Sequence, residues 1–127
     1  MEKKIINTAK APAALGPYSQ AIKVGNMVYT SGQLAINSAT GEFINDDIKK
    51  ATAQSLDNVR AILEEAGTSM DKVVKTLVLL KDINDFAAMN EVYATYFGDN
   101  PPARSCFQAG SLPKDALVEI EVIAIVE

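Results

Sequence analysis

Residues 117–126 form the stretch that decides the fold, and they are Leu117-Val118-Glu119-Ile120-Glu121-Val122-Ile123-Ala124-Ile125-Val126. Aliphatic and β-branched residues dominate this stretch, which predicts a strand. Side chains alternate between the two faces of a strand. One face therefore carries only apolar side chains, namely Val118, Ile120, Val122, Ala124 and Val126. The other face mixes carboxylates with large aliphatic side chains, with Leu117, Glu119, Glu121, Ile123 and Ile125. We expect the first face to pack against helices.

Two helices are expected to supply that packing. In residues 47–66 apolar side chains recur at spacings of three and four, which indicates one buried stripe. Asp46 is the expected N-cap, and Gly67 follows the last turn as helix-ending glycines do. Residues 85–97 form the second predicted helix, capped by Asp85. Its large side chains are assigned to the core: Phe86, Met89, Tyr93 and Tyr96.

The remaining regular segments are predicted strands. They are a hairpin of residues 21–24 and 27–34 around Gly25-Asn26, an almost wholly apolar strand at 73–80 expected to be buried on both faces, a strand at 103–108, and a short strand near 4–6. This order predicts one α+β domain over residues 1–127. Its mixed β-sheet would have two helices packed on one face.

The second face of the sheet then lacks a cover within one chain. Ile123 and Ile125 would join an exposed apolar patch, which usually marks a subunit interface. We therefore expect an oligomer that packs sheet to sheet. Glu119 and Glu121 either lie in that interface, where a buried carboxylate needs a partner, or face water at its rim. The spacing leaves both interpretations open.

Composition excludes several kinds of chemistry. The formal net charge is −4, and the 12 basic residues are scattered, so no nucleic-acid partner is expected. The chain has no histidine and one cysteine, Cys106, which excludes a Cys/His zinc site and a histidine-activated nucleophile. We expect no metal and no cofactor. The N-terminus lacks a signal-peptide pattern, and no apolar run approaches the roughly 20 residues of a membrane helix. A cytoplasmic protein without membrane contact is expected.

Arg104 is the first candidate for a ligand contact. It lies two residues before Cys106, so both side chains share one face of their strand. A guanidinium can hold a carboxylate through two parallel hydrogen bonds. The alternative is a salt bridge with Glu119 or Glu121, which is the commoner role of an arginine.

Three further candidates have equally plain alternatives. Cys106 is either a nucleophile or a small buried apolar residue, and the absence of histidine favours the second. Tyr18 either lines a pocket or is a half-buried aromatic after a turn. Ser31-Gly32 either presents backbone N–H groups to an anion or ends a strand. These residues alone indicate an oligomeric α+β domain with a candidate anion site.

Several separated motifs, in order and at matching spacing along nearly the whole chain, resemble one known family. They are Ala11-Pro12-Ala13-Ala14-Leu15-Gly16-Pro17-Tyr18-Ser19-Gln20-Ala21, Thr30-Ser31-Gly32-Gln33, Gln54-Ser55-Leu56-Asp57-Asn58-Val59, Lys81-Asp82-Ile83-Asn84-Asp85-Phe86, Pro102-Ala103-Arg104-Ser105-Cys106, Leu112-Pro113-Lys114-Asp115 and Val118-Glu119-Ile120-Glu121. The family is the Rid group of reactive intermediate deaminases, formerly the YjgF family, in its enamine/imine deaminase branch.

The resemblance implies a chorismate-mutase-like fold of the bacillus type, assembled as a homotrimer with active sites between subunits. It implies that Arg104 binds the substrate carboxylate and that Glu119 positions or activates water. It further implies substrate contacts by the backbone of Gly32 and Cys106 and by the residues that line the cleft, Tyr18, Ser31 and Asn90.

The implied activity is that of a 2-iminobutanoate/2-iminopropanoate deaminase, which hydrolyses imines released by pyridoxal-phosphate enzymes to 2-keto acids and ammonia. Two alternatives remain open. One is a non-catalytic regulatory trimer that binds keto acids, and the other is a ribonuclease or translation inhibitor. Residues 108–111 depart from many relatives, which leaves the preferred substrate size open.

Overall fold

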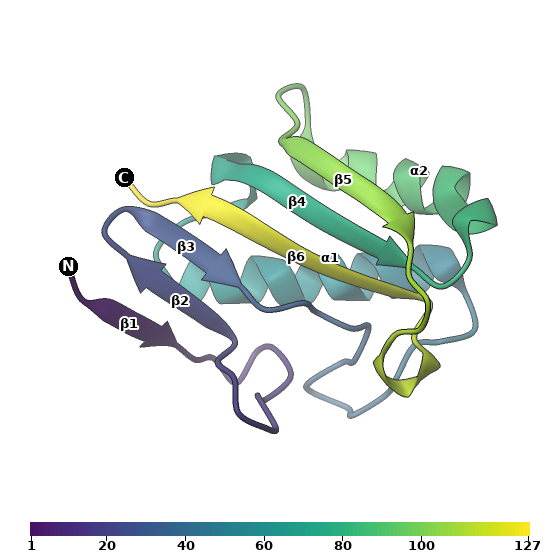
Figure 1. The fold of residues 1–127 in the computed structure, drawn as a ribbon, viewed down its shortest axis with the longest axis horizontal. Helices are drawn as coiled ribbons and strands as arrows, with labels where there is room; N and C mark the ends of the chain where they lie inside the picture. Colours follow the sequence, from purple (N-terminus) through teal and green to yellow (C-terminus); the bar gives the residue numbers. More distant parts are fainter.

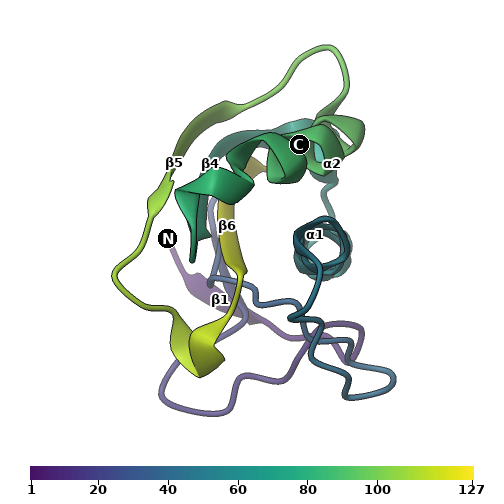
Figure 2. The same ribbon diagram turned by 90° about the vertical axis from the view of Figure 1, so that its right-hand side faces the viewer.

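The computed structural model describes residues 1–127, which build a six-stranded sheet with two helices on one face (Figures 1 and 2). The strands are β1 (Lys3–Ile6), β2 (Ala21–Val24), β3 (Met27–Thr30), β4 (Val73–Leu80), β5 (Ala103–Gln108) and β6 (Val118–Ile125). The helices are α1 (Ile48–Glu65) and α2 (Phe86–Phe97). Short 3₁₀ turns occupy Met70–Lys72, Ile83–Asp85 and Pro113–Asp115.

The strand order is β1-β2-β3-β6-β4-β5, which places the C-terminal strand inside the sheet. All neighbouring pairs are antiparallel except β4 and β5, which run parallel. A parallel pair needs a crossover connection, and α2 provides it. The predicted α+β class, the mixed sheet and the two helices on one face are therefore confirmed.

The alternation in β6 divides the two faces as predicted. Val118, Ile120, Val122 and Ala124 are buried, and the intervening residues are half-buried. The buried face packs against the apolar stripe of α1, including Leu56, Val59, Ile62 and Leu63. The core therefore lies between the helices and the sheet.

The predicted second arm of the hairpin is too long. β3 ends at Thr30, because the Thr30 hydroxyl accepts the Val122 N–H at 3.0 Å and so interrupts the regular ladder with β6. The chain regains β6 only at Gln33, which forms an isolated bridge with Ile120. Ser31-Gly32 thus lies at a strand end, in the break between the two pairings.

Both predicted N-caps need correction. Asp47, not Asp46, caps α1: its backbone is extended, and its carboxylate accepts the N–H groups of Lys49 and Lys50 at 2.9 and 3.2 Å. Asp85 precedes α2, but its side chain makes no capping hydrogen bond, because a 3₁₀ turn leads into the helix. Gly67 and Gly98 end the helices with positive φ, as glycine readily does.

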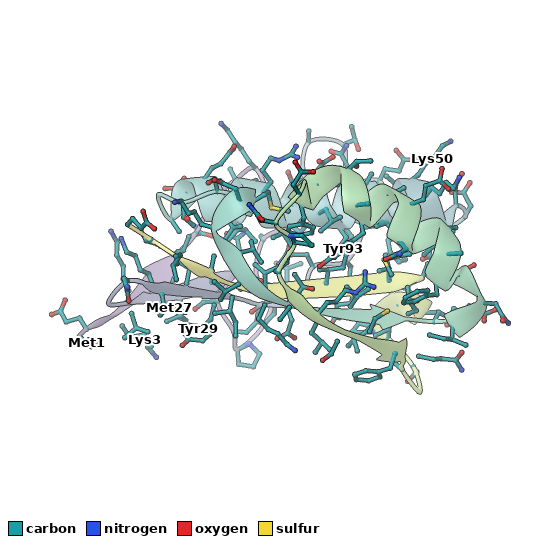
Figure 3. The ribbon with its side chains drawn as sticks, turned by 90° about the horizontal axis from the view of Figure 1, so that it is seen from above. Met1, Lys3, Met27, Tyr29, Lys50 and Tyr93 are labelled. Carbon is teal, nitrogen blue, oxygen red and sulfur yellow. The ribbon has the colours of Figure 1, made fainter.

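The face of the sheet opposite the helices is apolar and partly exposed. Figure 3 shows Met27 and Tyr29 directed away from the helices, whereas Tyr93 lies between α2 and the sheet. Tyr29 and Phe107 are 43% and 51% exposed, and Leu77, Leu79, Ile123 and Ile125 are half-buried. The prediction that residues 73–80 are buried on both faces is therefore wrong within one chain. Neither helix combines the length and apolar character needed to cross a membrane.

Candidate functional site

Arg104 is held on the helix side of the sheet by residues of α2. It pairs in register with Thr76, whose side chain is buried beneath the helices. Its Nη1 donates to Asn90 Oδ1 at 2.6 Å, and its guanidinium carbon lies 4.7 Å from the centre of the Tyr93 ring and 5.3 Å from that of Phe86. We call Arg104, Asn90, Tyr93 and Phe86 the arginine cluster. Arg104 forms no salt bridge, so the predicted alternative with Glu119 or Glu121 is wrong for this chain.

Tyr93 is fixed from behind by the sheet. Its hydroxyl forms a buried hydrogen bond of 2.8 Å with Thr76 Oγ1. Burial raises the pKa of Tyr93, against smaller lowering effects of the Thr76 hydrogen bond and the Arg104 charge. The ring therefore stays neutral at physiological pH and presents a fixed face to the guanidinium. A surface hollow of about 410 Å³ lies beside it, lined by Asn90, Tyr93, Ala94, Phe97, Gly98, Pro101, Pro102 and Arg104.

Cys106 lies on the same face as Arg104 and is half-buried against the core. Burial raises the pKa of its thiol, and the nearby Arg104 charge lowers it only in part. A thiol with a raised pKa is protonated at neutral pH and is a poor nucleophile. These surroundings favour the interpretation of Cys106 as a small apolar residue.

Glu119 lies on the opposite face of the sheet. Glu119 pairs in register with Leu79 of β4, and Arg104 pairs with Thr76 of the same strand. Leu79 and Thr76 are three positions apart, so they and their partners point to opposite faces of the sheet. Burial raises the pKa of Glu119, and the neighbouring Glu121 charge raises it further. A half-buried carboxylate with a raised pKa has the properties of a general base or acid.

Gly32 packs directly against Glu119. A Cβ atom at Gly32 would lie 2.5 Å from Glu119 Oε2, which no real contact allows. Only glycine therefore lets the backbone approach the carboxylate so closely. This contact explains why glycine follows Ser31 at the strand end.

Ser31 binds the loop that carries Tyr18 and does not leave its N–H free for an anion. The Ser31 hydroxyl donates to the Ser19 carbonyl at 2.6 Å, and the Ser31 N–H donates to Gln20 O at 2.8 Å. Ser31 thus fastens the Tyr18 loop. Tyr18 itself is 54% exposed rather than half-buried. An open hollow of about 520 Å³ is lined by Lys3, Pro17, Tyr18, Ser19, Ala21, Ile22, Tyr29, Thr30 and Ser31.

The candidate residues therefore form two groups with the sheet between them. Arg104, Asn90 and Cys106 lie on the helix side. Glu119 and Gly32, which we call the Glu119–Gly32 pair, lie on the other side. The first group can bind an anion and the second can move a proton, but one small ligand cannot contact both in a single chain.

The sequence prediction that Phe86 and Tyr93 belong to the core is confirmed for Tyr93 and wrong for Phe86, which is exposed. Both rings also face Arg104, which the prediction missed. Phe86, Asn90 and Tyr93 are spaced i, i+4 and i+7, which places them on one face of a helix. That spacing, seen together with Arg104, was the available signal. No three His, Cys, Asp or Glu side chains are grouped so that they could hold a metal ion.

Comparisons with known proteins agree over almost the whole chain. A family model described as endoribonuclease L-PSP matches residues 8–126. A RutC family protein of Pyrococcus abyssi is 54% identical over 127 residues, covering 100% of both chains. The 2-iminobutanoate/2-iminopropanoate deaminase of Capra hircus is 49% identical over 123 residues, covering 97% of this chain and 90% of that one. The crystal structure of E. coli TdcF with bound serine matches with a TM-score of 0.93 at 45% identity, covering 98% and 99%. The chain therefore belongs to the endoribonuclease L-PSP family, which is also known as the Rid or YjgF family.

Proposed function

We propose that this protein is a deaminase that hydrolyses 2-iminobutanoate and 2-iminopropanoate, and their enamine tautomers, to 2-keto acids and ammonia. The observation that carries the proposal is the arginine cluster. Arg104 uses one N–H on Asn90 and has no carboxylate partner, so its other N–H groups are free for a substrate carboxylate. The goat deaminase at 49% identity and the serine-bound TdcF structure at 45% identity support a ligand of this size and charge.

The active site is proposed to form between protomers of a homotrimer. Arg104 and Glu119 lie on opposite faces of one sheet, so a ligand that needs both must take them from different chains. The apolar face around Tyr29, Ile123 and Phe107 supports association, since exposed apolar surface of this kind favours burial against another copy. In this arrangement the arginine cluster of one protomer faces the Glu119–Gly32 pair of its neighbour.

The proposed mechanism is a hydrolysis with one residue moving the proton. Arg104 holds the carboxylate and fixes the imine carbon near Glu119. The substrate reacts as its protonated imine. Glu119 accepts a proton from water as the water oxygen bonds to the imine carbon, and the C=N electron pair moves onto nitrogen, which becomes a neutral amine. Glu119 then returns its proton to this nitrogen and the C–N bond breaks. As ammonia leaves, the hydroxyl oxygen forms the C=O bond and gives its proton back to the Glu119 carboxylate or to the ammonia. Acid–base help of this kind accelerates a reaction by roughly 10²–10⁴-fold.

The raised pKa of Glu119 suits both halves of this cycle. A carboxylate whose pKa lies closer to neutral pH accepts a proton more readily than an ordinary glutamate, and it can still release it. The reaction has no net redox change. We propose accordingly that no cofactor takes part.

Arg104→Ala tests the proposal in an assay where a threonine dehydratase generates 2-aminocrotonate continuously. We expect the wild-type chain to speed the appearance of 2-oxobutanoate and ammonia, and Arg104→Ala to lose most of that acceleration. Arg60→Ala is the matched control, because Arg60 also lies over an aromatic ring, Tyr96, but outside the proposed site. Unchanged turnover in Arg104→Ala would exclude the carboxylate-binding role.

Two other functions predict results that differ from those of a deaminase. A keto-acid sensor would bind 2-oxobutanoate through Arg104 without accelerating imine loss. A ribonuclease is suggested by the family description, endoribonuclease L-PSP. The net charge of −4 argues against a ribonuclease. Filter binding of single-stranded RNA across a salt series tests this function, and salt-dependent retention of RNA would support it.

A further inference from the structure

A buried polar junction connects α1 to the Glu119–Gly32 pair. The Gln33 carbonyl accepts two hydrogen bonds, one from the Ser55 hydroxyl at 2.7 Å and one from the Ile120 N–H at 3.2 Å. The Gln33 N–H returns a hydrogen bond of 2.8 Å to the Ile120 carbonyl. Gln33 directly follows Gly32, and Ile120 directly follows Glu119. The Gln33 carbonyl thus connects α1 to both backbone segments that carry the Glu119–Gly32 pair.

A second side chain of α1 extends the same connection. Asn58 is buried, and its Nδ2 donates to the carbonyls of Leu34 and Ile36 at 3.0 and 2.9 Å. Its Oδ1 accepts from Gln54 Nε2 at 2.9 Å, which orients the amide. Ser55 and Asn58 together therefore satisfy three carbonyls of residues 33–36, a segment without regular secondary structure.

We propose that Ser55 and Asn58 are positioning residues that set the distance between the Gly32 backbone and the Glu119 carboxylate. The proposal rests on the proposed deaminase function and deepens it. Glu119 has no salt-bridge partner in this chain, and its side chain occupies the space that a Cβ at position 32 would need. A small shift of residues 32–33 therefore moves the surface against which the carboxylate rests. The helix supplies the rigid support for that surface.

The role of these residues is separable from core stability by comparison with Thr52. Thr52 lies on α1 one turn before Ser55 and is also fully buried. Its hydroxyl donates to the Ile48 carbonyl of its own helix at 2.7 Å and not to a carbonyl of residues 33–36. Thr52→Ala therefore removes a buried hydroxyl from the same helix without removing a hydrogen bond of the junction.

Steady-state kinetics with 2-aminocrotonate provides the first test. We expect Ser55→Ala to lower kcat about ten- to a hundred-fold, because misplacement of a reacting group by about 1 Å has effects of this size. KM and the Kd for 2-oxobutanoate should change much less than kcat, because the carboxylate is held mainly by Arg104 and Asn90, to which Ser55 makes no hydrogen bond. Thr52→Ala should change neither parameter. Equal losses of kcat in both variants, or a loss in KM alone, would overturn the proposal.

A double variant shows whether Ser55 acts through Glu119. In a Glu119→Gln background, Ser55→Ala should cause no further loss of kcat, because residues that act through one another are not additive. A further ten-fold loss would contradict the proposal. If Ser55→Ala does not fold, Gln54→Ala should give the same pattern with a smaller loss, because Gln54 only orients the Asn58 amide.

Amide hydrogen exchange tests the junction independently of activity. The Gln33 and Ile120 amides should exchange faster in Ser55→Ala than in Thr52→Ala, measured at matched global stability. Faster exchange in Ser55→Ala together with a wild-type protein that has no deaminase activity would contradict the proposed function but support the role of Ser55 in holding residues 32–33. Equal exchange in both variants would sink the positioning role even if the wild type is an active deaminase.

Discussion

Gly32 and Glu119 are in contact so close that the Glu119 Oε2 atom lies 2.5 Å from where a Cβ at position 32 would stand. Gly32→Ala must therefore displace the carboxylate or the strand end. We predict a large loss of kcat with a loss of stability of about 1–3 kcal/mol, the usual cost of overpacking. Enzyme assays and urea unfolding measure the two effects.

Gly110→Ala is the control for this substitution, because a Cβ there meets no atom within 4 Å. It should leave both activity and stability close to those of the wild type. An active Gly32→Ala protein would show that Glu119 does not need its observed position.

Phe86 is predicted to strengthen the binding of carboxylates through Arg104. A ring over a partly exposed guanidinium contributes about 0.5–1 kcal/mol, and the ring centre lies 5.3 Å from the Arg104 carbon. Phe86→Leu should therefore weaken 2-oxobutanoate binding about two- to fivefold, as measured by calorimetry. Phe86→Tyr keeps the ring and should bind like the wild type. A Phe86→Leu protein with unchanged affinity would reduce Phe86 to a surface residue.

Glu119 should make stability depend on pH with a defined sign. Its pKa in the folded protein is raised above the ordinary value of 4.5, first by burial and then by Glu121. The folded state therefore binds the Glu119 proton more tightly than the unfolded state does. The resulting stabilisation is present below pH 4.5 and is lost as pH rises through the raised pKa.

Unfolding measured across this pH window should be flatter for Glu119→Gln than for the wild type. Glu121→Gln should lower the pKa of Glu119 and so move the acid limb of the kcat profile to lower pH. An acid limb that ignores both substitutions would mean that another group titrates in the rate.

Lys114 lies in a conformation that favours other residues. Its φ and ψ are 58° and 19°, and the following Asp115 also has a positive φ of 55°. A left-handed conformation costs an L-residue roughly 1–2 kcal/mol, and asparagine tolerates it better than lysine. Lys114→Asn should therefore raise the free energy of unfolding by about 0.5–1 kcal/mol. Urea unfolding that shows a lower stability would mean that the lysine makes a compensating contact.

The alternation in residues 118–125 was sufficient to predict which face of the sheet is buried, because the period of a strand is local. The choice between Asp46 and Asp47 as N-cap was not predictable. Both are aspartates, and tertiary packing decides which one is extended. Tyr93 was correctly assigned to the core, yet its second role depends on Arg104, 11 residues away along the chain.

The separation of Arg104 and Glu119 depends on pairing between strands far apart in sequence. Residues that pair across neighbouring strands share a face, so the positions of Arg104 and Glu119 follow from the registers of β5 and β6 on β4. Those registers are set by non-local contacts, and no motif in the sequence states them. The motifs supplied the candidate residues, and the registers place Arg104 and Glu119 on opposite faces of the sheet.

Subunit complementation tests the central claim most directly. Arg104→Ala and Glu119→Gln are each expected to retain only a small, measurable residual activity alone, since each lacks one half of every site. The two proteins are mixed, unfolded together and refolded. The mixed assemblies should regain a clear fraction of wild-type deamination, because some interfaces then combine an intact arginine cluster with an intact Glu119–Gly32 pair. A mixture that stays at the residual activity, although mixed assemblies are detected by native mass spectrometry, would contradict a site shared between protomers.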